Sequence, residues 1–315
     1  TKPSPASTIQ AIVLGLVFLP VLAALASPRV IAIGDVHGAY EELVSVLRHT
    51  GLVDENRRWV GGSTTLIQTG DVVDRGAGTR DCLDLFMALE PQAEKTGGKV
   101  IPLLGNHELM NLMTDLRYVT DEIYRTFATE KSEAVRQQAW QDYQEFISLH
   151  PDHAHTNVFA KDSTSRLKWM AAHPPGYFEY VDAMSRTGKY GSWLRKRHAI
   201  VQIGDGLFVH GGLNPGLKIR SAAELDDKIH VEIANIDDLW QSLSEKKIIW
   251  RYMTLDEIIP FISEEMKLMQ ARGREEDASA IQAMKKLMDY KTWLACSPDV
   301  PLWYSGLEYE KEEQL

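Results

Sequence analysis

Short apolar runs alternate with amphipathic stretches along the first third of the chain. Residues 29–33, 64–69 and 99–104 are rich in apolar and β-branched side chains, which predicts three short buried strands. Between these runs, the stretches 40–50 and 79–89 carry apolar residues three and four positions apart, the spacing of an amphipathic helix. Such strand–helix alternation is typical of an α/β sandwich.

The pattern changes beyond residue 110. From about 111 to 191 the chain predicts helices and loops, with many Trp, Tyr and His residues. Strands return at 199–203 and 207–210, and the Gly-Asp-Gly sequence between them suits a hairpin turn. The remainder, about 218–294, predicts mostly charged helices, and Pro260 stands where it could open one of them. Residues 308–315 form an acidic polar tail.

The N-terminus carries an almost unbroken apolar run at 11–26. This run is shorter than the roughly 20 residues that span a membrane, and it suits the apolar core of a secretory signal. Ala24 and Ala26 are small residues at the two positions that a signal peptidase reads. We therefore interpret 1–26 as a signal peptide, with an uncleaved membrane anchor and a buried helix as the alternatives. A signal peptide predicts the secretory pathway, or a periplasmic or extracellular location. An anchor predicts membrane contact through this segment only.

Composition and charge narrow the possible functions. The chain has 315 residues, 44% hydrophobic and 25% charged, which is enough apolar sequence for a sizeable core and excludes wholesale disorder. Its 34 Lys and Arg against 44 Asp and Glu give a net charge of −10, which argues against a protein that coats nucleic acid. Two cysteines exclude a disulfide framework and a cysteine-rich zinc site.

Polar motifs follow four of the predicted strands. They are GDVHG at 34–38, GDVVDRG at 70–76, GNHE at 105–108 and HGG at 210–212. A single Asp or His after a strand is commonly a cap or turn residue. Four such strand ends together predict a shared site, because ligands gather outside the carboxyl ends of the strands in an α/β sheet. Carboxylate and imidazole ligands suit divalent Mn, Fe or Zn, and a pair of metals needs a bridging carboxylate.

The four motifs resemble those of the calcineurin-like metallophosphoesterase superfamily. In form they resemble its phosphoprotein phosphatase branch, and the stretches 105–112, 115–119, 193–195 and 301–304 are similar to the bacterial-like Shewanella-type phosphatases. The resemblance covers roughly residues 30 to 307 and implies a metallophosphoesterase domain over about 27–307. The implied fold is an α/β metallophosphatase β-sandwich flanked by helices, with helical insertions at about 111–191 and 218–294.

The resemblance also implies a set of metal ligands. Asp35 and His37 would hold the first of two divalent ions, Asp71 would bridge both, and Asn106 and His210 would bind the second. A metal-bridging hydroxide would act as the nucleophile.

The same resemblance implies roles for four further residues. His107 would be the general acid that protonates the leaving alkoxide, and Asp74 would orient its imidazole and raise its pKa. Arg75 would bind phosphate oxygens through its planar guanidinium, the alternative being a surface ion pair. Arg117 is a second phosphate candidate, with a role on a helix surface as the alternative.

The sequence departs from the family pattern after His210. The family supplies a later histidine to the second metal, and the only histidine beyond His210 is His230, which stands in a charged stretch without the expected glycine. We expect it not to be a ligand, and we expect the last strands of the fold to be missing after residue 304. Among the other histidines, we expect His153 and His155 to be solvated loop residues.

Three functions remain open from the sequence. The first is a dinuclear metal-dependent phosphomonoesterase, an enzyme acting on a phosphorylated protein or a small phosphoester with Mn, Fe or Zn. The second is a dinucleoside polyphosphate hydrolase with the same chemistry. The third is a non-catalytic phospho-binding protein, if the missing ligand is truly absent.

Overall fold

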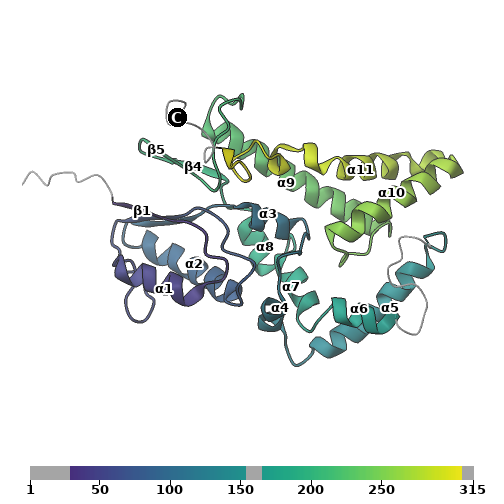
Figure 1. The fold of residues 1–315 in the computed structure, drawn as a ribbon, viewed down its shortest axis with the longest axis horizontal. Coiled ribbons are helices and arrows are strands. Elements are labelled where there is room, and N and C mark those ends of the chain that lie inside the picture. Colours follow the sequence, from purple (N-terminus) through teal and green to yellow (C-terminus); the bar gives the residue numbers. More distant parts are fainter. Residues whose placement is uncertain (1–28, 154–164, 307–315) are drawn as a thin grey trace, which may run out of the picture.

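The computed structural model describes residues 29–153 and 165–306. Three strands form a parallel sheet in the order β1-β2-β3, and two helices connect them (Figure 1). The bounds of these elements are β1 Val30–Ile33, α1 Tyr40–His49, β2 Thr65–Gln68, α2 Thr79–Glu94 and β3 Lys99–Pro102. The strand–helix alternation predicted from the sequence is therefore present, and the α/β fold class is confirmed.

Periodic apolar side chains explain these first elements. Leu43, Val44 and Leu47 form the buried face of α1, and acidic residues occupy its first turn. Every residue of β2 is buried, as expected for the central strand of the sheet. Helix α2 runs five residues beyond the predicted end at residue 89, through Pro91.

Helices follow the third strand, as the sequence predicts, and they begin at Asn106. Their bounds are α3 Asn106–Leu112, α4 Asp121–Phe127, α5 Ser132–Ser148, α6 Ser165–Ala172, α7 Tyr177–Met184 and α8 Lys189–Leu194. Large aromatic side chains fill their interior, and Trp169, Phe178 and Tyr180 are fully buried. These rings belong to the same apolar cluster as the sheet and its helices, and α4 packs against α2, so the insertion shares one core with the first part of the chain.

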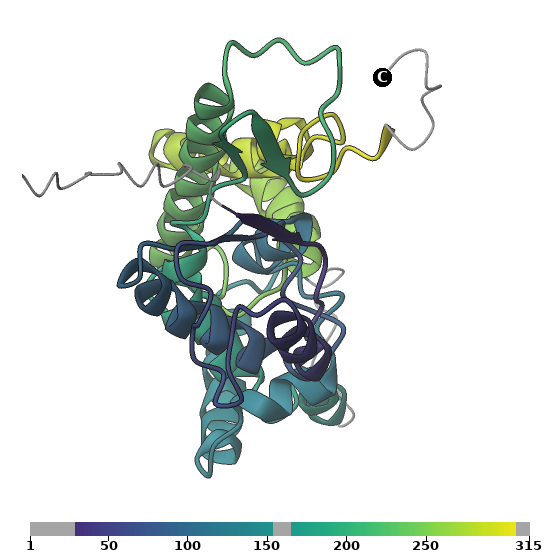
Figure 2. The same ribbon diagram turned by 90° about the vertical axis from the view of Figure 1, so that its left-hand side faces the viewer.

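The predicted hairpin is formed by β4 Ile200–Ile203 and β5 Gly206–Val209, which pair antiparallel. Figures 1 and 2 place this hairpin on the opposite side of the parallel sheet from α1 and α2. A backbone hydrogen bond of 2.8 Å from Leu104 to His198 joins the end of β3 to the start of the hairpin. The hairpin thereby brings a fourth strand end close to those of the sheet.

Three long helices complete the described chain. They are α9 Ala222–Glu245, α10 Leu255–Arg272 and α11 Ala278–Met288. A short 3₁₀ turn at Glu275–Asp277 lies between α10 and α11, and two more at Tyr290–Thr292 and Leu294–Cys296 follow α11. Helix α9 packs on β4, and α11 packs on both α9 and α10. The last turns return toward the hairpin, where Pro301 accepts a hydrogen bond from the Gly211 amide.

The prediction that Pro260 opens a helix is wrong. Helix α10 begins one turn earlier, after Thr254, whose backbone N–H donates to Glu257 in a capping box. This box satisfies the free amide groups at the helix start, so the boundary lies there. Pro260 lies inside α10, where its ring removes one internal hydrogen bond.

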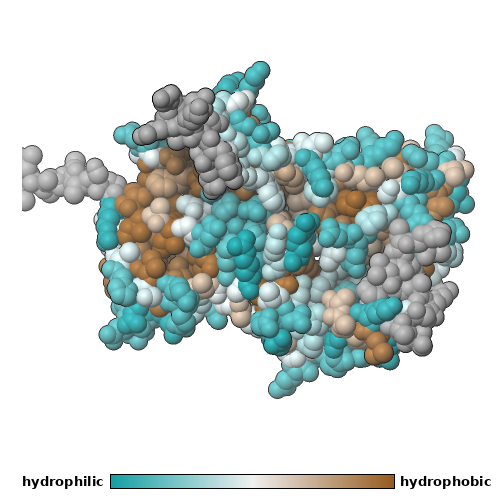
Figure 3. Space-filling model, viewed as in Figure 1, coloured by the Kyte–Doolittle hydropathy of each residue, from teal (hydrophilic) through white to brown (hydrophobic). Residues whose placement is uncertain are grey.

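Segments at both ends lie outside the described residues, including the predicted signal peptide or anchor at 1–26 and the acidic tail at 308–315. Within 29–153 and 165–306, no helix is both long and apolar enough to cross a bilayer. On the face drawn in Figure 3, apolar side chains gather at the end of the molecule that carries β1. Strand β1 is an edge strand there, and Val30 is exposed.

Candidate metal centre

Four strand ends converge at one place in the fold. Asp35 follows β1, Asp71 follows β2, Asn106 opens α3 just after β3, and His210 follows β5. The Nε2 atom of His210 lies 2.9 Å from Asn106 Oδ1 and 3.4 Å from Asp71 Oδ2. Residues up to 175 positions apart in the sequence, from 35 to 210, therefore share one centre. The convergence predicted from the motif positions is observed.

Asp71 lies in the middle of this centre. Its Oδ2 atom is 3.4 Å from Nε2 of both His37 and His210, and the residue is only 3% exposed. Two groups of possible ligands share it, His37–Asp71–His107 and Asp35–Asp71–His210, and the ligand atoms of each lie within 4.8 Å of one another. Burial raises the pKa of Asp71, which the neighbouring His210 opposes. A bound cation would relieve this cost of burying a carboxylate.

The two inner histidines are oriented as metal ligands usually are. His37 Nδ1 lies 2.9 Å from the Val73 carbonyl, and His210 Nδ1 lies 3.0 Å from the Thr69 carbonyl. These bonds place the proton on Nδ1 and turn the lone pair of Nε2 toward the centre. Nε2 of His37 is buried and has no hydrogen-bond partner within the described part of the chain. Burial also lowers the pKa of His37, which favours the neutral form that binds metal.

The donor set therefore fits divalent cations. Asp35 lies beside both histidines, with its oxygens 3.7 Å from His37 Nε2 and 3.8 Å from His210 Nδ1. Together with the Asp71 carboxylate and the Asn106 amide oxygen, the centre offers the mixture of oxygen and imidazole ligands that Mn, Fe and Zn accept. Nε2 of His37 faces the carboxylates of Asp71 and Asp35 without a hydrogen bond, and a cation bound between these groups would satisfy it.

The backbone of the centre is held in unusual conformations. Four of the seven non-glycine residues with positive φ in the described chain belong to it, namely His37, Asp71, Asp74 and Arg75. Such conformations cost energy and cluster at functional sites. The GNHE motif needs glycine at position 105, because a Cβ there would lie 2.2 Å from Asp71 Oδ1. A larger residue at this position would displace the central carboxylate.

Glu108 organises the loop that carries Asp71, a role the sequence analysis did not assign. Its fully buried carboxylate accepts backbone N–H groups from Asp71 and Gly105 on one oxygen and from Val72 and Val73 on the other. Burial and the charge of Asp71 raise the pKa of Glu108, while these backbone donors lower it. The available signal was that Glu108 is the one acidic residue in the sequence that forms α3.

Replacing Glu108 with glutamine should destabilise the protein by about 3 kcal/mol, because an amide nitrogen would then face two buried backbone donors. Denaturant unfolding measures this loss. The exposed Glu122→Gln variant, in which an ion pair on α4 is removed, is the control and should unfold like the unmodified protein. Equal denaturant concentrations at the unfolding midpoints of the two variants would contradict the role given to Glu108.

His107 and Asp74 form a buried pair beside the centre. His107 Nδ1 lies 2.6 Å from Asp74 Oδ2, and its Nε2 faces Arg75 at 3.3 Å and Asp71 at 3.8 Å. Burial lowers the pKa of His107, but the hydrogen bond to Asp74 and the charges of Asp71 and Asp74 outweigh it, so the pKa is raised. The imidazole can therefore carry a proton at Nε2 and present it to the cavity in front of it.

A cavity of about 450 Å³ opens in front of His107. Its lining includes Arg75, Asn106, His107, Tyr118, Tyr290 and Trp303. Arg75 is exposed there, and among the described residues it forms no ion pair with a carboxylate, so the predicted alternative of a surface ion pair is not observed. Its guanidinium contacts His107 Nε2 at 3.3 Å and can bind an anion in the cavity through its other N–H groups.

Three other arginine and histidine residues considered from the sequence do not belong to the metal centre. Arg117 lies in a turn between α3 and α4 rather than on a helix, and it binds Asp115 with two bonds of 2.7 and 2.8 Å. His230 lies on α9 with its Nδ1 2.9 Å from the Asp226 carbonyl, and it belongs to neither ligand group. The expectation that His153 is solvated is wrong, because it is buried against Glu265. His155 lies outside the described residues.

Comparisons with known proteins point to one family. A family model described as calcineurin-like phosphoesterase matches residues 28–265. The chain is 32% identical over 191 residues to Shewanella-like protein phosphatase 2 of Arabidopsis thaliana, covering 59% of this chain and 46% of that protein. It is 27% identical over 228 residues to Shewanella-like protein phosphatase 1 of Plasmodium berghei (strain Anka), covering 70% and 51%. The chain thus spans about half the length of these curated relatives.

A solved structure is also similar. It is described as a cold-active protein-tyrosine phosphatase of a psychrophilic Shewanella species, and it matches with a TM-score of 0.49 and 22% sequence identity. The match covers 90% of this chain and 59% of that chain.

Proposed function

Because the chain belongs to the calcineurin-like phosphoesterase family, we propose that it is a metal-dependent phosphomonoesterase that acts on a phosphorylated protein. The observation that carries this proposal is the convergence of Asp35, His37, Asp71, Asn106 and His210 on one centre, next to the His107–Asp74 pair and to Arg75, which has no carboxylate partner among the described residues. The names of the curated relatives as protein phosphatases support a protein substrate.

Two divalent cations fit the donor set. Asp35 and His37 would hold one, Asn106 and His210 the other, and Asp71 would contact both. When bound, such cations supply Lewis-acid polarisation of the phosphoryl oxygens and activation of water. Mn, Fe and Zn all accept these ligands, and Mn is the ion we propose to test first.

The protein side chains would carry the remaining steps. Arg75, which lines the cavity, would bind phosphoryl oxygens of the substrate and help to hold the phosphorus in position for attack. As water adds to phosphorus and the ester P–O bond breaks, protonated His107 would give its Nε2 proton to the leaving oxygen. Asp74 would hold Nδ1–H of His107 throughout and stabilise the imidazolium before the transfer, as its 2.6 Å contact permits. Products are the alcohol and inorganic phosphate.

The proposal is tested by assaying the purified full-length chain with added Mn²⁺. We expect hydrolysis of 4-nitrophenyl phosphate and of a phosphopeptide, and loss of both on treatment with a chelator. A dinucleoside tetraphosphate in parallel tests the alternative hydrolase. Preferential cleavage of that compound would replace the protein substrate in the proposal. No turnover with Mn²⁺, Fe²⁺ or Zn²⁺ would reject the enzymatic function.

A further inference from the structure

A chain of buried hydrogen bonds continues from the His107–Asp74 pair into the helical insertion. Nδ2 of Asn111 donates to Asp74 Oδ1 and to the His107 carbonyl, both at 2.9 Å. Oδ1 of Asn111 accepts a hydrogen bond from the Tyr180 hydroxyl. Asp74, Asn111 and Tyr180 are each at most 1% exposed, so water cannot take the place of any of these partners.

Each polar group in this series of hydrogen bonds has only one orientation in which all of its hydrogen bonds form. Asp74 uses Oδ2 for His107 and Oδ1 for Asn111, so its carboxylate cannot rotate without losing a bond. Flipping the Asn111 amide would place an oxygen against the carboxylate of Asp74, where two acceptors would face each other. Burial raises the pKa of Tyr180 far above its usual value, so its hydroxyl keeps the proton that it donates.

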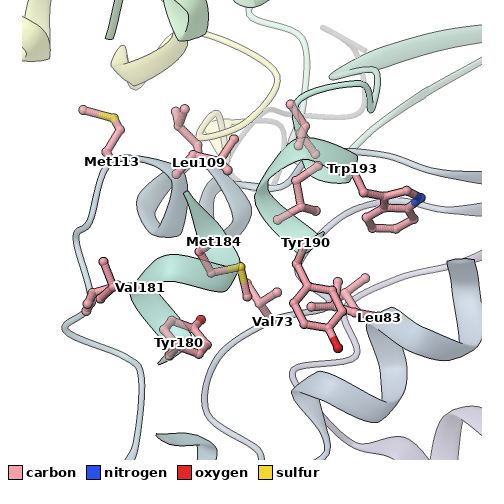
Figure 4. Close-up of a cluster of buried hydrophobic side chains, with 14 of the residues drawn as sticks. Val73, Leu83, Leu109, Met113, Tyr180, Val181, Met184, Tyr190 and Trp193 are labelled. Carbon is pink, nitrogen blue, oxygen red and sulfur yellow. The ribbon is translucent and has the colours of Figure 1, made fainter. Parts of the chain in front are cut away.

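The ring of Tyr180 is fixed by the elements around it. It makes edge-to-face contacts with Tyr124 and Phe127 of α4, at centroid distances of 5.5 and 4.9 Å. Figure 4 shows Tyr180 and Met184, both on α7, in the same buried cluster as Val73 and Leu109. Val73 directly precedes Asp74 in the chain. The hydroxyl is therefore held in place by packing, and it sets the position of the Asn111 amide.

We propose that Asn111 and Tyr180 are positioning residues for the His107–Asp74 pair. They fix the carboxylate of Asp74 so that His107 presents Nε2 to the leaving oxygen, an assignment that rests on the proposed phosphatase function. Tyr180 stands 69 residues beyond Asn111 in the sequence, on a helix of the insertion. The insertion thus contributes to the geometry of proton transfer as well as to the core.

Tyr180→Phe tests this role because it removes one hydroxyl and keeps the ring. Tyr177→Phe is the matched control, since Tyr177 is a buried tyrosine of the same helix whose hydroxyl donates to the Tyr252 carbonyl at 2.9 Å. Two phosphate esters separate positioning from general damage. Phenyl phosphate releases a basic phenolate that needs the His107 proton, whereas 2,4-dinitrophenyl phosphate releases an ion that does not.

We expect Tyr180→Phe to lower kcat for phenyl phosphate about tenfold, with KM and the rate on the dinitrophenyl ester little changed. Tyr177→Phe should leave all of these near the wild-type values. In a His107→Asn background, Tyr180→Phe should cause no further loss, because the group that it positions is gone. Equal losses on both esters, or full additivity with His107→Asn, would overturn the proposal.

An NMR measurement distinguishes the positioning role of Tyr180 from the proposed phosphatase function, because it needs no catalytic turnover. The His107 Nδ1–H proton, bonded to Asp74, should give a downfield imidazole signal in the NMR spectrum of histidine-labelled protein. We expect Tyr180→Phe to shift or broaden this signal, and Tyr177→Phe to leave it in place. If the wild type hydrolyses neither ester, the phosphatase function fails, and an unchanged signal in Tyr180→Phe independently rejects the positioning role.

Discussion

Replacing Asp71 with asparagine should reduce metal-dependent turnover about a thousandfold or more while the protein stays folded. No other single change should be as damaging, because Asp71 is the ligand that both proposed metal positions share. The loss should appear first in metal binding. The variant should retain less than half of the metal that the wild type binds.

The local geometry explains why the fold should survive this change. Asp71 Oδ1 accepts the His107 N–H at 3.1 Å, and the oxygen of an asparagine amide can keep that bond. Its NH₂ group would then occupy the position of Oδ2, facing Nε2 of His37 and His210 without a lone pair to offer a cation. The φ angle of 60° at Asp71 is one that asparagine tolerates well.

Asp226→Asn is the control for this variant. Asp226 is also a buried aspartate, it accepts the Ala199 N–H, and it contacts His198 at 2.6 Å, away from the centre. Elemental analysis and kcat/KM on 4-nitrophenyl phosphate are compared for both variants. A fully active, metal-replete Asp71→Asn protein would contradict the shared role of Asp71.

Replacing His107 with asparagine should lower kcat by about a hundredfold, less than the loss expected for Asp71→Asn, and leave the metal content unchanged. The reason is that the imidazole, held by Asp74, supplies a proton to the leaving oxygen, whereas an amide cannot. The effect should be smallest for esters with acidic leaving groups, which depart without protonation.

Metal content is the decisive readout for His107, because its Nε2 is close enough to His37 and Asp71 to be considered a ligand. Elemental analysis of His107→Asn beside His230→Asn, a histidine outside the centre, separates the two roles. Loss of metal from His107→Asn alone would make His107 a ligand and remove it as the proton donor.

The sheet and the centre were predictable from sequence because both depend on local patterns. Apolar runs that end in Gly-Asp or Gly-Asn locate the carboxyl ends of strands, and parallel strands bring such ends to the same edge. The resemblance drawn from these motifs is confirmed by the family match over residues 28–265. The roles of the individual residues remain predictions.

The supporting contacts were not predictable in the same way, because they join segments that no local pattern relates. Glu108 acts through backbone amides of a loop 35 to 37 residues away. Tyr180 reaches Asn111 only through the packing of α7 against α3 and α4. His153 lies in a loop as predicted, but its burial could not be predicted, because its partner, Glu265, lies 112 positions further along the chain.

The most direct test of the account is a crystal structure of the chain grown with Mn²⁺, recorded with anomalous scattering. The account predicts two anomalous peaks on either side of the Asp71 carboxylate, one beside His37 and the other beside His210. Peaks elsewhere on the surface, or none at all at full Mn²⁺ loading, would contradict it.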